Sequence, residues 1–404
     1  MAVETATLTP IEMTGVQTRL NEEEEQALIR VLRESNALAT GVEGEAFEKE
    51  FTDFFGSADS VCLSSCSSAL ELSAVLTDLK PGQEVILPAH TFCATGVPFA
   101  RTGATLRWAD IDPDTRVVTA ETIEPLISDA TRVIVVVHLY GLVADMDPIL
   151  ALAEKHDLQV VEDCAQAPGA RYKGRRVGTL GHFGCFSFHT QKNITTLGEG
   201  GMLTVRDATH GVQARRLRWM GNWPFEGKRE AYWKPAMSNV VEPIPGRLPV
   251  NFSMGEPNAA VGRLLLKRLD PINEQRRYQA DRFIGAFSKN KELVFQKVPD
   301  DCEHVYHLMA ARFDGQIIGK HRDDLIAHLA DAYRLKTIVQ YWPLNRTELF
   351  SKIGFGEAQV PESDRFFDNM ISFPWWSDMS DSLIDDMAGR VKSALEDLRG
   401  GLDG

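Results

Sequence analysis

The stretch that decides the fold is RVIVVVHLYGLVADMDPILALAEKHDLQVVED, residues 132–163. Its first part, residues 132–138, is a β-branched run of the kind found in a strand buried on both faces. Residues 145–157 follow with helical spacing and with Asp145 as a candidate cap, and residues 158–163 form another apolar strand. A strand, a helix and a second strand in this order predict a right-handed crossover between parallel strands.

The same alternation continues on both sides of this unit. The expected strands cover residues 59–64, 84–88, 104–111, 184–189 and 200–205, and the expected helices cover residues 21–35, 43–56, 67–79 and 90–102. Repeated units of this kind predict an α/β fold, with a large domain whose mostly parallel sheet is covered by helices.

The pattern changes in the last third of the chain. Residues 256–287 predict one long helix, with Pro271 expected to kink or break it. Strand candidates at residues 304–313 and 337–343 and a closing helix at 381–399 predict a smaller C-terminal α+β domain. We therefore expect a large domain over residues 1–270, beginning with a loose arm over residues 1–15, and a small domain over residues 271–404.

The composition is that of an ordinary globular protein. The chain has 404 residues, of which 44% are hydrophobic and 25% are charged, and its formal net charge is −14. Two domains are expected because single cores stop growing at roughly 250–300 residues. The acidic balance excludes general nucleic-acid binding, because a phosphate backbone requires a basic face.

The six cysteines are scattered along the chain, with no C-x-x-C pair. This pattern favours reduced thiols in the cytoplasm over a disulfide framework, and it predicts no metal site of the zinc type. Residues 1–15 lack the basic start and apolar stretch of a signal peptide. The apolar runs are far shorter than the roughly 20 residues that a membrane span needs. We therefore expect a cytoplasmic enzyme without a membrane or nucleic-acid partner.

The most specific chemical signal is GCFSFHTQKNITTLGEGGML, residues 184–203. Here Lys192 leaves a strand into a loop that contains Gly198, Gly200 and Gly201. Glycines let the backbone approach a ligand closely. A lysine that forms a Schiff base must be partly buried, so that its amine can lose its proton. A single lysine is more often a solvated surface charge, so this interpretation depends on the surrounding motifs.

Two more polar segments follow predicted strands, at the sheet edge where ligands of such folds bind. In LSSCSSALEL, residues 63–72, backbone N–H groups at a helix start suit a phosphate, and Ser67 can add a hydroxyl; the alternative is a serine cap. In VVEDCAQAPGA, Asp163 ends a strand and Gln166 lies three residues on. Asp163 could cap the next helix. In an enzyme of pyridoxal phosphate (PLP) it would pair with the pyridine nitrogen, and Gln166 would donate to the ring's phenolic oxygen.

Two segments resemble the central blocks of the DegT/DnrJ/EryC1/StrS family of sugar and cyclitol aminotransferases almost residue for residue. They are residues 138–170 and FSFHTQKNITTLGEGGM, residues 186–202, and the resemblance runs from about residue 18 to residue 395. It implies the PLP-dependent transferase fold type I, with PLP as the cofactor. By position, it makes Lys192 the lysine that carries PLP and Asp163 the partner of the pyridinium nitrogen.

The resemblance implies further cofactor contacts. Gln166 stands where the family contacts the cofactor's oxygen, and Ser187 stands where the family binds the phosphate. Cys66 and Ser67 occupy the position of the family's usual Gly-Thr pair. The backbone contact can survive this change, but Cys66 is a departure that can shift the phosphate cup.

Two residues outside these blocks also match the family by position. Phe92 stands where an aromatic ring stacks on the cofactor, although from the residues alone it could be plain core. Asn251 resembles the asparagine that reaches the phosphate from a partner subunit, although it could be a turn residue. The match implies a homodimer with shared active sites.

The acceptor is less well defined by the sequence. Residues 215–247 interleave basic residues with tryptophan and tyrosine, which predicts either a site for a nucleotide diphosphate and its base or a dimer-interface loop. His304 and His307 resemble a segment near the nucleotide site of members that use nucleotide sugars. Many relatives carry histidines at the position of Gln340 and near that of Asn345. Their absence here supports the alternative of a cyclitol ketone or an unactivated keto sugar.

The sequence thus predicts a PLP-dependent aminotransferase that moves an amino group from glutamate or glutamine to a keto sugar, nucleotide-linked by first preference, in amino-sugar or antibiotic biosynthesis. The free amine of Lys192 would move a proton between Cα and C4′, while Asp163 keeps the ring nitrogen protonated. A PLP dehydratase of the same family is a rival. By resemblance, however, that branch carries a histidine at the position of Lys192. A non-catalytic relative would have no need for Lys192, Asp163 and Ser187 together.

Overall fold

The computed structural model describes residues 8–222 and 240–400. Within these residues a seven-stranded sheet has the order β1-β9-β8-β5-β4-β2-β3. Its strands are β1 Asp59–Leu63, β2 Glu84–Pro88, β3 Thr105–Ala109, β4 Thr131–Val137, β5 Gln159–Asp163, β8 Phe183–Ser187 and β9 Gly201–Val205. Of these described strands only β9 runs antiparallel to its neighbours, β1 and β8. The mostly parallel sheet of the predicted α/β fold is therefore confirmed.

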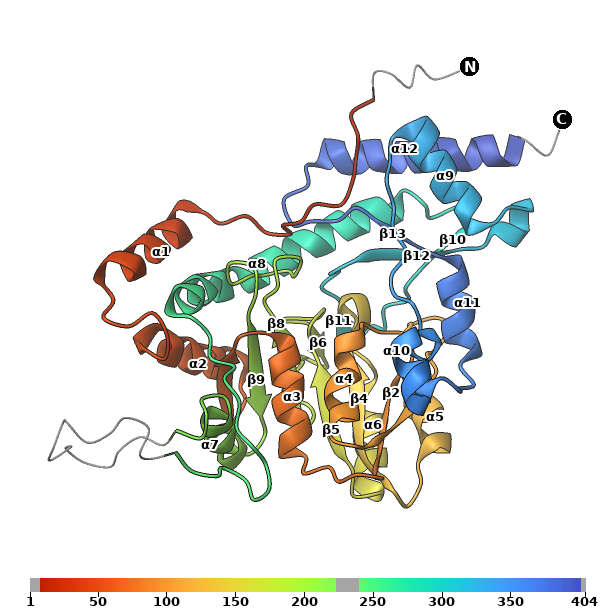
Figure 1. The fold of residues 1–404 in the computed structure, drawn as a ribbon. Coiled ribbons are helices and arrows are strands. Elements are labelled where there is room, and N and C mark those ends of the chain that lie inside the picture. The colour runs from red at the N-terminus through yellow and green to blue at the C-terminus, as the bar shows by residue number, and fades with distance from the viewer. Residues whose placement is uncertain (1–7, 223–239, 401–404) are drawn as a thin grey trace, which may run out of the picture.

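Helices cover both faces of this sheet (Figure 1). The helices of this part of the chain are α1 Glu22–Glu34, α2 Val42–Phe55, α3 Cys66–Leu76, α4 Val97–Arg101, α5 Ala120–Ile123, α6 Met146–Lys155 and α7 Ala208–Leu217, with 3-10 turns η2 Cys93–Thr95, η3 Glu124–Leu126 and η4 Leu139–Gly141. Successive strand residues enter two different cores: Val85 and Leu87 pack on one face of the sheet and Ile86 on the other. The helix expected over residues 90–102 is instead the short pair η2 and α4.

Helix α8, Glu256–Gly285, joins the sheet to the C-terminal part of the chain. Its first half packs into the sheet core through Leu265, and its second half packs through Phe283 into a separate core. Pro271 lies inside this helix, so the expected break there is wrong. Buried residues on both sides of Pro271 keep the helix continuous, at the cost of one backbone hydrogen bond. The domain boundary at residue 270 falls within α8 and stays a prediction.

The C-terminal part contains the small antiparallel sheet β10-β12-β13, packed with helices as an α+β unit (Figure 1). Its elements are β10 Leu293–Phe295, β12 Met309–Phe313, η5 Gly315–Ile318, α9 Arg322–Tyr333, η6 Leu344–Arg346, α10 Glu348–Phe350, the π-turn η7 Ser351–Phe355, α11 Pro361–Asn369, β13 Met370–Phe373 and α12 Asp381–Gly400. A third small sheet pairs β11 Cys302–Glu303 with β6 Arg171–Tyr172 and β7 Arg175–Arg176.

Two expectations for the small unit differ from the structure. The strand expected over residues 337–343 is reduced to one bridge between Ile338 and Ser372. The chain then leaves the small sheet and runs to the large one, where the Leu344 N–H donates to Ala89 O at 2.7 Å. The arm expected to be loose is fixed at Ile11, which is buried in the small core and bridges to Leu335. Residues 1–7 of that arm lie outside the described residues.

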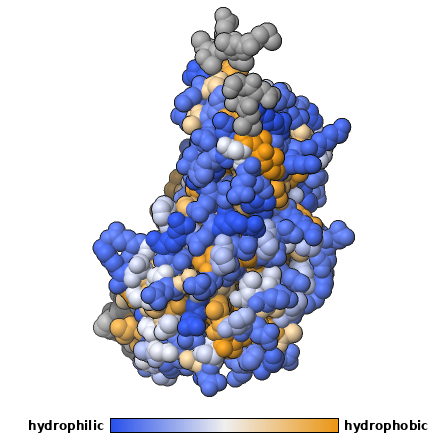
Figure 2. Space-filling view, turned by 90° about the vertical axis from the view of Figure 1, so that its right-hand side faces the viewer, coloured by the Kyte–Doolittle hydropathy of each residue, from blue (hydrophilic) through white to orange (hydrophobic). Residues whose placement is uncertain are grey.

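The face that carries α11 is mostly polar, with hydrophobic side chains in separate patches (Figure 2). Within residues 8–222 and 240–400, no helix combines the length and the apolar character that crossing a bilayer requires.

Candidate active site

The carboxyl ends of the parallel strands meet at one edge of the large sheet, and the segments that follow them carry most of the predicted site residues. Cys66 and Ser67 follow β1, Phe92 follows β2, Asp163 and Gln166 lie at the end of β5, and Ser187 and Lys192 lie at the end of β8. Because β9 is antiparallel, it begins at the same edge with Gly201. The topology therefore gathers seven of the eight predicted residues at one place.

Lys192 is half-buried in the loop after β8, where its backbone N–H donates to His189 O at 2.8 Å. Burial lowers the pKa of its amine, although the nearby ionisable groups of Cys66, Asp163 and Glu199 act in the opposite direction. A lowered pKa favours the neutral amine, which is the form that attacks a carbonyl carbon. This environment is the one that the Schiff-base interpretation requires.

Asp163 is 5% exposed at the end of β5. One carboxylate oxygen, Oδ1, accepts the Ala165 N–H at 3.0 Å, and Oδ2 accepts the Thr95 hydroxyl at 2.8 Å. Burial raises the pKa of Asp163, while these two hydrogen bonds and the nearby Lys192 act to lower it. A cation placed against this carboxylate would stabilise its charged form and so offset the effect of burial. A protonated pyridine nitrogen is such a cation.

The start of α3 forms the expected phosphate end of the site. Its N-cap is Ser65, whose hydroxyl oxygen accepts the Ser68 N–H at 3.1 Å. Cys66 is buried and Ser67 is exposed in the first turn, so their backbone N–H groups stand at the positive end of the helix. The serine cap and the phosphate site are thus compatible, because different residues provide them. Ser187 lies buried across the site, at the end of β8.

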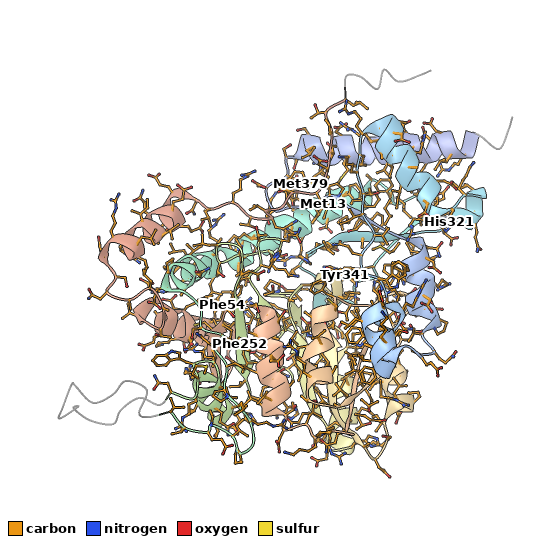
Figure 3. All side chains as sticks on the ribbon, viewed as in Figure 1. Met13, Phe54, Phe252, His321, Tyr341 and Met379 are labelled. Atoms are coloured by element: carbon orange, nitrogen blue, oxygen red, sulfur yellow. The ribbon has the colours of Figure 1, made fainter. Side chains whose placement is uncertain are left out.

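Gln166 and Phe92 meet the demands of the cofactor's ring. The side-chain oxygen of Gln166 accepts the Tyr140 N–H at 2.8 Å. This hydrogen bond orients the amide, so that its NH₂ group can donate to a ligand. Phe92 is 53% exposed, so its ring is accessible to a ligand. Its ring centroid lies 5.9 Å from that of Tyr341, which Figure 3 labels near the upper edge of the large sheet.

Two of the three glycines after Lys192, Gly200 and Gly201, lie against the chain's own atoms. A Cβ atom on Gly201 would lie 2.3 Å from the backbone of Ser65, and one on Gly200 would overlap the Thr196 hydroxyl. These glycines admit the chain's own atoms, and Gly201 lets β9 pack against the start of α3.

Asn251 lies in a segment that runs beside the end of β1, where the Ser64 N–H donates to the Phe252 carbonyl at 2.8 Å. It is exposed, it forms a bridge to Trp219, and its side-chain oxygen accepts the Ser253 N–H at 3.4 Å. Among the residues that the structure describes, no hydrogen bond connects Asn251 to the other seven. Its exposed position is compatible with a contact to a second chain.

Three arginines of the segment 215–247 form ion pairs with the chain's own carboxylates. Arg215 pairs with Glu48 at 2.8 Å and with Asp59, and Arg218 also pairs with Glu48. Arg247 donates to Asp78 and to the Leu79 carbonyl. These three arginines therefore neutralise the chain's own carboxylates and carbonyls. Of the other basic and aromatic residues of this segment, the structure describes Arg216 and Trp219, whereas Trp223, Lys228, Arg229, Tyr232, Trp233 and Lys234 lie outside the described residues.

A cavity of about 410 Å³ lies between the start of α2, the end of α7 and the start of α8. Trp219, Ser253 and Met254 contribute to its wall, and Met254 also packs beside Gly200 in the loop after Lys192. The cavity therefore adjoins both Asn251 and the far side of the Lys192 loop.

Sequence reasoning missed two neighbours of Asp163. Thr95 donates to its carboxylate, and Tyr341, whose pKa is raised by burial and by the charge of Asp163, approaches from a segment 178 positions further along. The spacing of Thr91 and Thr95, four residues apart after a predicted strand, was an available signal. Nothing in the sequence indicates the approach of Tyr341.

Fold and site together define a PLP-dependent enzyme. A buried amine with a lowered pKa, a buried carboxylate, a helix start for the phosphate and an exposed aromatic ring all fit this cofactor. The chain belongs to the DegT/DnrJ/EryC1/StrS aminotransferase family, which matches residues 19–392. It is therefore a PLP-dependent aminotransferase.

Individual relatives agree with this assignment. The spore coat polysaccharide biosynthesis protein SpsC of Bacillus subtilis is 35% identical over 383 residues, covering 93% of this chain and 95% of that protein. The dTDP-3-amino-3,4,6-trideoxy-α-D-glucose transaminase of Streptomyces venezuelae is 31% identical, covering 90% of each chain. The crystal structure of an aminotransferase from Psychrobacter cryohalolentis is similar with a TM-score of 0.87 and 27% identity, over 97% of this chain and 99% of that one.

Proposed function

We propose that this enzyme transfers an amino group from glutamate or glutamine to a nucleotide-linked keto sugar, in amino-sugar or antibiotic biosynthesis. The observation that carries the proposal is the meeting of Lys192 and Asp163 at one sheet edge, in a chain that is 31% identical to a dTDP-sugar transaminase. The similarity to a spore coat polysaccharide biosynthesis protein supports a sugar as the acceptor.

The residues would share the work as follows. Lys192 would hold the cofactor through its amine and, once released, move a proton to and from the substrate carbon. The start of α3 and Ser187 would bind the phosphate, and Phe92 would cover the ring. Bound PLP supplies the electron sink for the reaction. Asp163 would keep the ring nitrogen protonated, and the Gln166 amide would donate to the phenolic oxygen.

A cyclitol ketone or an unactivated keto sugar is the second candidate acceptor. Many relatives are expected to carry a histidine at the position of Gln340 and another near that of Asn345. The side-chain oxygens of Gln340 and Asn345 are buried without a hydrogen-bond partner among the described residues. In addition, Arg215 and Arg218 are engaged in internal ion pairs, which leaves fewer described cations for a diphosphate.

A panel of donors and acceptors, read by mass spectrometry, tests the proposal. We expect amination of a dTDP- or UDP-linked keto sugar with glutamate or glutamine, and no amination by the matched Lys192→Ala variant. Amination of an inosose alone would favour the cyclitol alternative. Turnover by Lys192→Ala near the parent rate would contradict the role of Lys192 itself.

The proposal includes a homodimer with shared active sites and a cytoplasmic location. The exposed Asn251 beside a large cavity supports the dimer. The six cysteines are free thiols, which supports a reducing compartment.

A further inference from the structure

Two buried threonines form a hydrogen-bonded chain that ends on Asp163. Thr95, in η2, is 1% exposed and donates through Oγ1 to Asp163 Oδ2 at 2.8 Å. The Thr91 hydroxyl oxygen lies 3.0 Å from that of Thr95 and is also 1% exposed. The contact joins segments 68 residues apart, after β2 and at the end of β5.

The chemistry of a hydroxyl gives this chain a direction. Each hydroxyl has one proton to donate and two lone pairs to accept with. Since the Thr95 proton goes to the carboxylate, the Thr91 proton must go to Thr95. The Ala165 N–H meanwhile donates to the other carboxylate oxygen at 3.0 Å. Each oxygen of Asp163 thus receives one donor, an arrangement that suits an ionised carboxylate.

Other groups near Asp163 act on its charge from every side. Burial disfavours the charged form of Asp163, whereas Lys192 and His138 favour it. The ionisable groups that face Asp163 are Cys66 from α3, His138 after β4, Cys164 after β5, Cys185 from β8, Lys192 after β8 and Tyr341 from the C-terminal part. Burial raises the pKa of Asp163, and the hydrogen bond from Thr95 acts to lower it.

We propose that Thr95, oriented by Thr91, is a positioning residue that holds Asp163 as a carboxylate, so that the proton shared with the PLP ring nitrogen stays on nitrogen. The inference rests on the proposed role of Asp163. Without the Thr95 donor, the carboxylate would compete better for the shared proton. The ring would then be a poorer electron sink.

The test uses the holoenzyme reconstituted with nitrogen-15-labelled PLP, since the nitrogen-15 chemical shift reports whether the ring nitrogen carries the proton. Thr95→Val keeps the shape and removes the hydroxyl. We expect its nitrogen signal to move toward that of neutral pyridine and its PLP dissociation constant to rise about tenfold, as loss of one hydrogen bond to a charged group implies. Thr95→Ser, which keeps the hydroxyl, should restore both values. Thr91→Val should shift the signal in the same direction by less.

Thr77→Val is the matched control, because the Thr77 hydroxyl is buried and donates to the Ala74 carbonyl at 2.9 Å away from the site. It should leave the nitrogen signal unchanged. An unchanged signal in both Thr95→Val and Thr91→Val would overturn the inference, provided that Asp163→Asn moves it. If Asp163→Asn leaves the signal unchanged as well, the proposed role of Asp163 fails instead. If Thr95→Val does not fold, Thr91→Val tests the inference instead. A nitrogen signal that moves toward that of neutral pyridine supports the inference, and a signal that does not move in this direction overturns it.

Discussion

At the residue scale, burial acts in opposite directions on the two central ionisable side chains. It lowers the pKa of Lys192 and raises the pKa of Asp163, so in each case it disfavours the charged form. The two groups partly compensate each other, because each favours the charged form of the other. The cofactor-free enzyme therefore holds two charges at a cost in stability, which the bound cofactor would relieve.

The stability cost of Lys192 gives a prediction for the cofactor-free protein. Between the lowered folded pKa and the ordinary value of about 10.4, the folded protein binds fewer protons than the unfolded chain, so stability rises with pH. Below both values the whole cost is present. Lys192→Met should therefore be more stable than the parent at about pH 7, and this advantage should shrink toward about pH 10. Urea unfolding at the two pH values measures it.

The exposed Lys289 gives the matched control for that experiment. Lys289→Met should change stability equally little at both pH values. A Lys192→Met variant that is less stable than the parent at about pH 7 would show that burial does not govern this amine.

Asp163→Asn keeps the side chain's shape and removes its charge. An amide lacks the negative charge that keeps the pyridine nitrogen protonated, so we expect kcat to fall about a thousandfold, since each pKa unit of lost pairing corresponds to about tenfold. Single-turnover kinetics with glutamate measures the effect. Asp110→Asn is the control, because the Asp110 carboxylate accepts the backbone N–H groups of Ile111, Glu362 and Ser363 and the Ser363 hydroxyl, away from Lys192. If Asp163→Asn loses less than about tenfold, Asp163 is only a local cap.

At the element scale, a buried carboxylate fixes the position of β8 beside β5. Glu162 is fully buried and accepts the N–H groups of Gly178, Leu180 and Gly181 at 2.7–2.9 Å. It also lies 3.0 Å from His138 Nε2, which must donate because His138 Nδ1 accepts the Ala144 N–H. The turn before β8 is thereby tied to the neighbour of Asp163. His138, Glu162 and Cys164 lie close enough to resemble a metal site, but these hydrogen bonds account for Glu162.

Glu162→Gln should destabilise the fold, because one carboxylate oxygen becomes an NH₂ group that faces other donors. We expect a loss of about 3 kcal/mol in the free energy of unfolding, the usual cost of unsatisfied buried polar groups. Denaturant unfolding measures this loss.

Glu124→Gln is the control for that change, because Glu124 forms an exposed ion pair with Lys155. It should cost less than about 1 kcal/mol. A comparably small loss in Glu162→Gln would mean that the turn before β8 holds its position without this carboxylate.

At the scale of the whole molecule, α8 connects two cores, and the exposed surface near its start carries Asn251. Arg276 of α8 reinforces the connection from within, since it is fully buried and donates to the carbonyls of Tyr306 and His307 and to the Ser377 hydroxyl. The large sheet, the small unit and the N-terminal segment thus meet around one helix. The proposed shared site would add a second chain to this arrangement.

Complementation tests the shared site. A heterodimer of a Lys192→Ala chain and an Asn251→Asp chain would contain one doubly damaged site and one intact site, if each site uses Lys192 of one chain and Asn251 of the other. Its activity should approach about half that of the parent dimer. Heterodimers are purified through two different tags and assayed against both homodimers.

A second heterodimer, which pairs the parent with the double variant, is the control. With shared sites both of its active sites are damaged, whereas with separate sites one stays intact. The reverse result, an inactive first heterodimer and a half-active second one, would mean that Asn251 acts within its own chain.

The sequence alone determined the alternation of strands and helices and the residues at the strand ends. Lys192, Asp163 and Cys66 could be assigned to one site because parallel strands bring their carboxyl ends to the same edge, whatever their side chains contact. Local spacing and position suffice for such assignments, and the resemblance to a family added their roles.

Only the tertiary structure decided which groups meet across long separations. The donation of Thr95 to Asp163 and the ion pairs of Arg215 with Glu48 and Asp59 join residues 68 to 167 positions apart. The same holds for the continuous α8, where packing on both sides of Pro271 overrides the local preference for a break. Such contacts depend on how sheets and helices pack, because a polar group removed from water takes whichever partner the packing brings within reach.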